Sequence, residues 1–271
     1  MDIKTSRVLL VGATGGIGQK IASVLHYAGA KLVLVGRNEK KLDYVCASIE
    51  QQGDNKPDII VADITSSAGR QAIVNAANHY PDGINVIINC AGINKFAMFE
   101  DLDEENIQQL INTNITAPFQ LIQLLLPHLR NQPQATIMNV GSTFGTIGFA
   151  GFTVYSATKY AMRGFTEALR RELSDSNISV SYIAPRATDT ELNTTGIISM
   201  NRELGVSVDQ PVKVANEVLN ALTEDIEEVY IGWPEKFFVK LNSIFPRLVD
   251  KALKKKLPVI RHYAKQVEFV N

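Results

Sequence analysis

Short apolar runs rich in β-branched residues recur along this chain, and segments with helical periodicity separate them. Several runs are apolar on both faces, which is typical of strands in a parallel sheet that helices cover on each side. This alternation predicts an α/β fold with a doubly wound parallel sheet, Rossmann-like, of about seven strands with helices on both faces. The predicted strands are residues 7–12, 31–36, 58–63, 85–92, 135–142, 179–185 and 228–233. The predicted helices are residues 16–28, 38–52, 66–79, 103–131, 154–175 and 209–224.

A glycine-rich turn, "VGATGGIGQ", follows the first predicted strand and opens the first predicted helix. Gly12, Gly16 and Gly18 let the chain turn tightly, bring backbone N–H groups to a phosphate and pack the helix against the strand. The spacing is Gly-x-x-x-Gly-x-Gly, with Thr14 and Ile17 between the glycines. This position favours a dinucleotide site. A methyltransferase also carries glycines after its first strand, so the turn alone leaves that class open.

The pentapeptide "YSATK" places Tyr155 and Lys159 on one face of a predicted helix, one turn apart. By itself the pair fits an ordinary amphipathic surface. Together with "GATGGIG", "NCAG" (89–92), "NTNITAPF" (112–119) and "NVGS" (139–142), however, it resembles the short-chain dehydrogenase/reductase family over about residues 5–233. Ser142, thirteen residues before Tyr155, makes the set specific.

The resemblance implies an oxidoreductase that moves a hydride between a nicotinamide cofactor and a carbonyl or alcohol substrate. Tyr155 is then the proton donor or acceptor. A free tyrosine has a pKa of about 10, and we expect the Lys159 ammonium and the oxidised cofactor's charge to lower it. The family's pattern also makes Ser142 a hydrogen-bond donor to the substrate oxygen and Asn114 the holder of a water that connects Lys159 to solvent. As alternatives, Ser142 caps a turn and Asn114 marks a kink or a surface position.

The same resemblance implies cofactor contacts at the ends of the later strands. Asp63 lies beside the adenine ring, or else caps the next helix. Tyr155 and Lys159 also contact the cofactor, the lysine at the nicotinamide ribose. Cys90 stands where the family has an asparagine, which puts one structural hydrogen bond in doubt. Arg186 stands where the family has glycine and, as an alternative, points toward the substrate. The remaining implied contacts are Asn89, Ala91, Gly92, Pro185, Thr188 and Thr190.

The end of the second strand indicates which cofactor is used. An acidic residue there would bind the adenosine ribose of NAD. This chain has Gly36 at that position and Arg37 after it. Because a guanidinium pairs with a 2′-phosphate, we predict NADP(H), with reduction as the cellular direction. A solvated arginine at a helix start is the alternative.

The chain divides into a dinucleotide-binding catalytic part, residues 1–234, and a basic C-terminal extension of the same domain, residues 235–271. Residues 191–208 form the family's variable substrate loop, and their apolar side chains suggest a roomy cleft for a ketone or a lipid-like carbonyl compound. In the extension, apolar residues at helical spacing alternate with lysines, and Pro246 begins a second helix or bends the first. The extension either packs over the cleft or a partner subunit, or lies on an anionic membrane surface.

Composition narrows the function further. The chain has 271 residues, a formal net charge of −1 and two cysteines without metal-site spacing. We therefore expect no nucleic-acid partner, no metal site and a cytoplasmic protein, peripheral at a membrane if the extension binds one. The resemblance implies a homodimer or homotetramer that pairs through residues 103–131 and 154–175. Two other functions stay open: a catalytically idle dinucleotide-binding sensor or scaffold, and a nucleotide-sugar epimerase, for which the chain after residue 190 is short.

Overall fold

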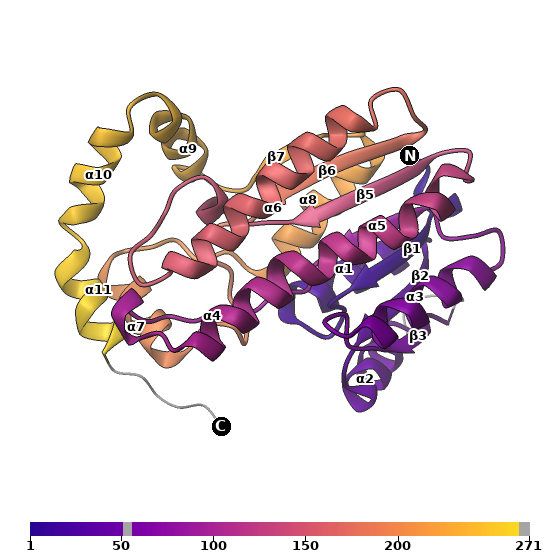
Figure 1. The fold of residues 1–271 in the computed structure, drawn as a ribbon, viewed down its shortest axis with the longest axis horizontal. Helices are drawn as coiled ribbons and strands as arrows, with labels where there is room; N and C mark the ends of the chain where they lie inside the picture. The colour runs from indigo at the N-terminus through magenta and orange to yellow at the C-terminus, as the bar shows by residue number, and fades with distance from the viewer. Residues whose placement is uncertain (51–55, 266–271) are drawn as a thin grey trace.

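The structure is a computed structural model that describes residues 1–50 and 56–265. Within these residues, seven parallel strands form one sheet in the order β3-β2-β1-β4-β5-β6-β7, with helices on both faces (Figure 1). The predicted Rossmann-like α/β fold is confirmed. The strands are β1 (Arg7–Val11), β2 (Lys31–Gly36), β3 (Asp58–Val61), β4 (Val86–Asn89), β5 (Ala135–Val140), β6 (Ile178–Ala184) and β7 (Glu228–Tyr230).

Helices connect successive strands and continue after the last one. The helices up to the end of α6 are α1 (Gly16–Tyr27), α2 (Glu39–Glu50), α3 (Ser67–His79), α4 (Glu104–Ile111), α5 (Ala117–Arg130) and α6 (Thr153–Glu172). Those that follow β6 are α7 (Thr195–Glu203), α8 (Pro211–Thr223), α9 (Glu235–Ile244), α10 (Pro246–Lys254) and α11 (Leu257–Ala264). In Figure 1, α9, α10 and α11 lie together beyond the end of the sheet.

The alternation of side chains along each strand builds one core on each face of the sheet. In β1, Val8 and Leu10 pack in the cluster that contains α1, α2 and α8, whereas Leu9 and Val11 pack in the cluster that contains α3, α5 and α6. Helices therefore cover both faces of the sheet and exclude water from them. This explains why the central strands are almost continuously apolar in sequence.

The strand order reverses at β1, which lies between β2 and β4. Because all strands are parallel, their carboxyl ends share one edge, and the reversal opens a crevice at that edge. The residues that follow the strands therefore meet there, although long stretches of sequence separate them.

The segment predicted as one helix at 103–131 is interrupted. A π-helical turn, Asn112–Thr116, separates α4 from α5. The prediction of a continuous helix was wrong because helical periodicity does not register an inserted residue. π-Turns of this kind are frequent at functional sites, and Asn114 lies at the centre of this one.

The chain after β6 is more ordered than the sequence predicted. Residues 191–208 contain α7, whose first turn is capped by the Thr194 hydroxyl, which accepts a hydrogen bond from Ile197 N (3.4 Å). Residues 235–265 of the extension form three helices. Pro246 begins α10, which is one of the two alternatives that the sequence predicted. Residues 266–271 of the extension, and the last residues of the helix predicted at 38–52, lie outside the described part of the chain.

Candidate active site

The predicted site residues gather along the carboxyl edge of the sheet. Representative residues follow different strands, so their spatial order along the edge is the order of the strands in the sheet. From β3 to β6 they are Asp63, Arg37, Gly12, Ala91, Ser142 and Pro185.

The turn between β1 and α1 requires glycine at two positions. Gly12 has a φ of +85°, and a Cβ there would lie 2.6 Å from Ala91 N. A Cβ on Gly18 would lie 2.1 Å from Gly12 O. At Gly16 a Cβ would lie 3.0 Å from Thr190 Cγ2, so Thr190 lies directly over the turn. The backbone is thus bare where a dinucleotide phosphate would approach the start of α1, and these residues fit such a group.

The ends of β2 and β3 form the next part of the edge. Arg37 is exposed, and a Cβ on Gly36 would lie 3.1 Å from Thr14 Cγ2, so a larger side chain is crowded there. Asp63 Oδ1 accepts hydrogen bonds from Thr65 N (2.9 Å) and Thr65 Oγ1 (2.7 Å). Partial burial raises the pKa of Asp63, but the Thr65 bonds and the Arg37 charge outweigh it and hold the pKa below its usual value.

Asp63 does not cap the helix that follows it. The N-cap of α3 is Ser66, whose hydroxyl accepts a hydrogen bond from Gly69 N (3.0 Å). The alternative structural role that the sequence allowed for Asp63 is therefore wrong, and its carboxylate instead closes a turn next to Arg37.

A buried chain of hydrogen bonds links β4, β5 and α6. Asn89 Nδ2 donates to Asn139 Oδ1 (2.8 Å), and Asn139 Nδ2 donates to Thr166 Oγ1 (2.9 Å). Asn89 Oδ1 is buried without a hydrogen-bond partner among the described residues. Asn89 therefore ties the strands together beneath the edge, while Ala91 and Gly92 lie at the edge itself.

Helix α6 carries Tyr155 and Lys159 on one face, next to the loop after β5. Lys159 Nζ lies 5.6 Å from the centroid of the Tyr155 ring and donates a hydrogen bond to Val140 O (3.2 Å). Ser142 Oγ accepts a hydrogen bond from Phe144 N (3.1 Å), so the turn-capping role of Ser142 is confirmed. Because a hydroxyl can accept and donate at once, Ser142 keeps its proton for a second partner.

The pKa of Tyr155 moves in the opposite direction from the one expected. Burial raises it to about 12, a hydrogen bond with Ser142 lowers it in part, and Cys90 adds to the rise. Burial also lowers the pKa of Lys159 to about 8, against a smaller opposing effect of Cys90. At neutral pH Tyr155 is therefore a neutral phenol that can donate a proton, while most Lys159 side chains remain charged.

Asn114 connects the loop after β4 to α6. Its Oδ1 accepts from Ile93 N (2.9 Å), and its Nδ2 donates to Ile93 O (2.9 Å) and to Thr158 Oγ1 (3.1 Å). A Cβ on Gly92 would lie 3.4 Å from Asn114 Oδ1 and 3.6 Å from Lys159 Nζ. Asn114 thus lies close to the lysine. It is buried and both hydrogens of its Nδ2 are bonded, so the surface alternative is wrong.

Tyr182 in β6 is a positioning residue that the sequence analysis missed. Its hydroxyl donates to Ser142 O (3.1 Å) and accepts from Ser142 N (3.3 Å). A Cβ on Gly141 or Gly145 would lie 2.2 or 2.4 Å from that hydroxyl, so the loop after β5 closes around the tyrosine. The two glycines that bracket Ser142 are the sequence signal for this arrangement.

A cavity of about 470 Å³ opens beside Ser142 and Tyr155. Phe144, Phe149 and Phe152 form part of its wall, and α7, α9, α10 and the loops after β5, β6 and α7 contribute most of the remainder. The lining is mainly apolar. The variable loop and the extension, which the sequence left as separate features, together enclose the cleft.

Arg186 lines this cavity, but its guanidinium is engaged by protein groups. Its guanidinium donates two hydrogen bonds to Asp209 (2.8 and 2.9 Å), one to Glu235 (2.8 Å) and one to Trp233 O (2.9 Å). Lys213 also bonds Asp209 (2.9 Å). Four of the five N–H donors of the guanidinium bond to protein acceptors, and the arginine ties the loop after β6 to the start of α9.

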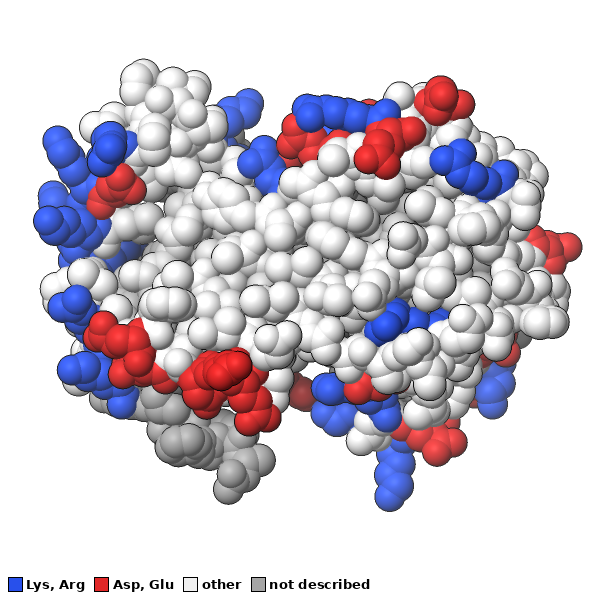
Figure 2. Space-filling model, in the orientation of Figure 1, with Lys and Arg blue, Asp and Glu red and all other residues white. Residues whose placement is uncertain are grey.

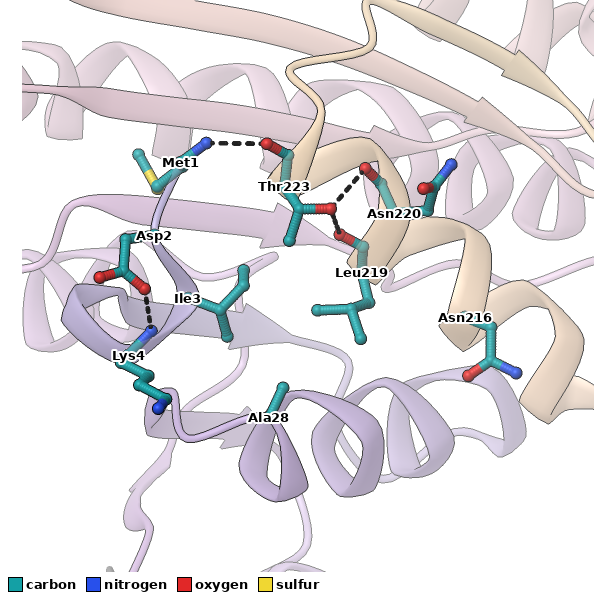
Figure 3. Close-up of a pocket in the computed structure, with 9 residues that line it drawn as sticks. All are labelled: Met1, Asp2, Ile3, Lys4, Ala28, Asn216, Leu219, Asn220 and Thr223. Atoms are coloured by element: carbon teal, nitrogen blue, oxygen red, sulfur yellow. Dashed lines mark hydrogen bonds between the residues drawn. The ribbon is translucent and has the colours of Figure 1, made fainter.

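A second depression, of about 490 Å³, lies between the N-terminus, the end of α1 and α8 (Figure 3). The Met1 ammonium donates to Leu222 O (3.1 Å) and Thr223 O (3.2 Å) at its rim. The bonds drawn in Figure 3 are those of Met1, of the Thr223 hydroxyl and of the Asp2 carboxylate, and none of the predicted site residues lines this depression. We therefore place the candidate site at the other cavity.

Comparison with known proteins supports this assignment. Residues 6–197 match the family model described as short chain dehydrogenase. The chain is 31% identical to the ketoacyl reductase HetN of Nostoc sp. over 90% of this chain and 86% of the relative. It is 30% identical to an uncharacterized oxidoreductase of Staphylococcus aureus, over 83% and 94% of the two chains. Among solved structures, a short-chain dehydrogenase from Sphingobium yanoikuyae in complex with NADPH has a TM-score of 0.76, 25% identity and coverage of 90% and 95%. A protein from Burkholderia phymatum in complex with NAD shares the fold, with a TM-score of 0.83, 19% identity and coverage of 92% and 96%.

Proposed function

Because the chain belongs to the short-chain dehydrogenase/reductase family, oxidoreductases that use a nicotinamide dinucleotide, we propose that it reduces the carbonyl group of an apolar substrate with NADPH. The observation that carries the proposal is that Ser142 and Tyr155 line a largely apolar cavity while Lys159 lies 5.6 Å from the centroid of the Tyr155 ring. An idle binding module would need neither the three side chains nor the cavity.

The proton chemistry follows from the protonation states. Bound at this edge, the nicotinamide supplies the hydride. The Ser142 hydroxyl donates to the carbonyl oxygen of the substrate and fixes its position beside Tyr155. Tyr155, kept neutral by burial, gives its phenolic proton to that oxygen as negative charge develops on it. The Lys159 ammonium, held against Val140 O, stabilises the phenolate that remains.

Asn114 stabilises the position of α6, the helix that carries Tyr155 and Lys159. Through its bonds to Ile93 and Thr158 it fixes the loop after β4 against α6. Thr158 Oγ1 in turn donates to Tyr155 O (2.7 Å). We propose that Asn114 also holds a water that returns the proton to Lys159.

The preference for NADPH rests on the end of β2. Gly36 offers no carboxylate to the adenosine ribose, and the exposed Arg37 guanidinium is available for a 2′-phosphate. Replacing Arg37 by alanine should raise the KM for NADPH by about tenfold, the effect of one charge-assisted bond in a solvated place, and leave the KM for NADH nearly unchanged. An equal change in both KM values would refute the assignment.

The cavity lining and the ketoacyl reductase relative both favour a ketone that carries an apolar chain. The direct test measures the loss of reduced cofactor with a panel of ketones that differ in chain length, alongside the corresponding alcohols with NADP. We expect kcat/KM to rise with chain length until the cavity is filled. Dinucleotide binding without turnover of any carbonyl compound would instead support the sensor or scaffold function.

We further propose that the enzyme is cytoplasmic and works as a homodimer or homotetramer. Free Cys46 and Cys90 suit a reducing compartment. The pairing helices would be α4, α5 and α6, which expose Leu124 and Tyr160. Light scattering at micromolar concentration tests the assembly, and a monomer would refute it.

A further inference from the structure

Residues 233–256, which include α9 and α10, form a cap over the cleft. On the inner side of the cap, Leu241, Val249 and Leu253 line the cavity. Asn242 Nδ2 donates to Thr146 O (2.8 Å), and Glu235 is paired with Arg186. These contacts hold the cap against the body of the protein and account for one face of its helices.

The outer side of the cap has no such partner among residues 1–50 and 56–265. Six large apolar side chains there are between 40% and 71% exposed, within sixteen consecutive positions. Single exposed apolar residues are ordinary, whereas a gathering of this size marks an interaction surface. The six are Trp233, Phe237, Phe238, Ile244, Phe245 and Leu248.

The same segment is strongly basic. It holds seven lysines and arginines against two acidic residues, Glu235 and Asp250, and Glu235 is already neutralised by Arg186. Figure 2 shows blue side chains gathered along the edge of the molecule that α10 occupies in Figure 1. The whole chain is close to neutral, so this positive charge is a property of the cap.

The outer apolar surface continues into the cavity. Phe238 and Leu248 line the cavity and are also exposed to solvent. An apolar chain that passes from the outside of the cap into the cleft could therefore stay in contact with apolar side chains all the way.

We propose that the outer face of the cap binds the surface of an anionic lipid bilayer. Trp233, Phe237, Ile244 and Phe245 enter the boundary of the acyl chains, and the lysines lie at the anionic head groups. Among residues 1–50 and 56–265 no helix combines the length and the hydropathy of a membrane-spanning segment. The proposed contact is with the bilayer surface. The cleft then draws its apolar ketone from the bilayer past Phe238 and Leu248, a step that rests on the proposed function.

Charge decides against a second copy of the chain as the occupant. A two-fold interface brings the same patch from both subunits together. Here it would set seven positive charges against seven others. An anionic bilayer offers negative head groups to the lysines and arginines, and acyl chains to the apolar side chains beside them.

Sedimentation of the full-length protein with vesicles tests the contact without any measurement of activity. We expect binding to phosphatidylglycerol vesicles at low salt, little binding to phosphatidylcholine vesicles, and loss of binding in molar salt. The double variant Ile244→Ser/Phe245→Ser should bind at least about tenfold more weakly, because less apolar surface enters the bilayer.

The matched control is Tyr27→Ser/Tyr44→Ser, which removes two exposed aromatic side chains from α1 and α2, away from the cap. It should bind like the wild type. Vesicle binding that is unchanged in the Ile244/Phe245 variant would overturn the proposal, as would a wild-type protein that ignores anionic vesicles. A variant that changes the oligomeric state in light scattering would also overturn it, since the patch would then be a subunit interface.

Delivery from the bilayer is tested separately. With a long-chain methyl ketone dissolved in phosphatidylglycerol vesicles, the Ile244/Phe245 variant should lose rate, while its kcat/KM for a short water-soluble ketone stays at the wild-type value. Equal loss on both ketones would refute delivery from the bilayer. Failure of all ketones to react would refute the proposed function and leave the vesicle-binding result standing.

Discussion

Replacing Arg186 by methionine tests how the cap is held over the cleft. Asp209 and Arg186 are largely buried, with side chains only 8% and 12% exposed. Removing one partner of a buried pair costs about 3–5 kcal/mol because the other charge is left without compensation. Lys213 remains bonded to Asp209 (2.9 Å), so we expect the lower end, about 3 kcal/mol.

That loss converts to a change in melting temperature. The unfolding entropy of globular proteins is about 2.1 cal/mol/K per residue, so about 3 kcal/mol lowers the Tm of a chain of 271 residues by about 5 °C. Calorimetry measures it. The control is Arg163→Met, which breaks a pair with Glu228 (3.3 Å) that is about one third exposed and should cost under about 1 kcal/mol. Equal Tm losses in the two variants would refute the argument.

The same pair gives a signed pH dependence. Hydrogen bonds from Arg186, ahead of the opposing effect of burial, hold the pKa of Asp209 below its usual 3.8 in the folded chain. Its stabilising contribution is therefore complete above about pH 4 and is lost as the pH falls through the folded pKa. The Tm difference between wild type and Arg186→Met should shrink below pH 4. Arg186 also pairs with Glu235, the first residue of α9, and α9 lines the cavity. The variant should therefore loosen α9 and raise the KM for the ketone.

Three further predictions concern the chemistry. Tyr155→Phe removes only the hydroxyl and should lower kcat by roughly a hundredfold or more while cofactor binding persists; wild-type turnover would refute its role as proton donor. The rate of reduction should fall above about pH 8, because Lys159, whose pKa burial lowers to about 8, then loses its charge; a rate that stays constant to pH 10 would contradict this. Tyr182→Phe removes the hydroxyl that bonds the backbone of Ser142, and it should lower kcat while the KM for NADPH changes less. If only thermal stability fell, Tyr182 would have no positioning role.

The sequence alone was enough for the features that depend on local spacing. Apolar runs at strand and helix periods determined the layers of the fold, since each strand must bury both faces. Gly12 and Gly18 were identifiable because a turn from strand to helix leaves no space for a Cβ there. Tyr155 and Lys159 were identifiable because residues four apart in a helix share a face.

Other features depend on segments that are distant in the chain, and only the tertiary structure decided them. Arg186 meets Asp209 and Glu235, and Ser142 meets Tyr182, across gaps that no periodicity encodes. The upward shift of the Tyr155 pKa has the same origin. A sequence shows the charged neighbour one turn away, but the burial that raises the pKa is produced by the elements packed around the site.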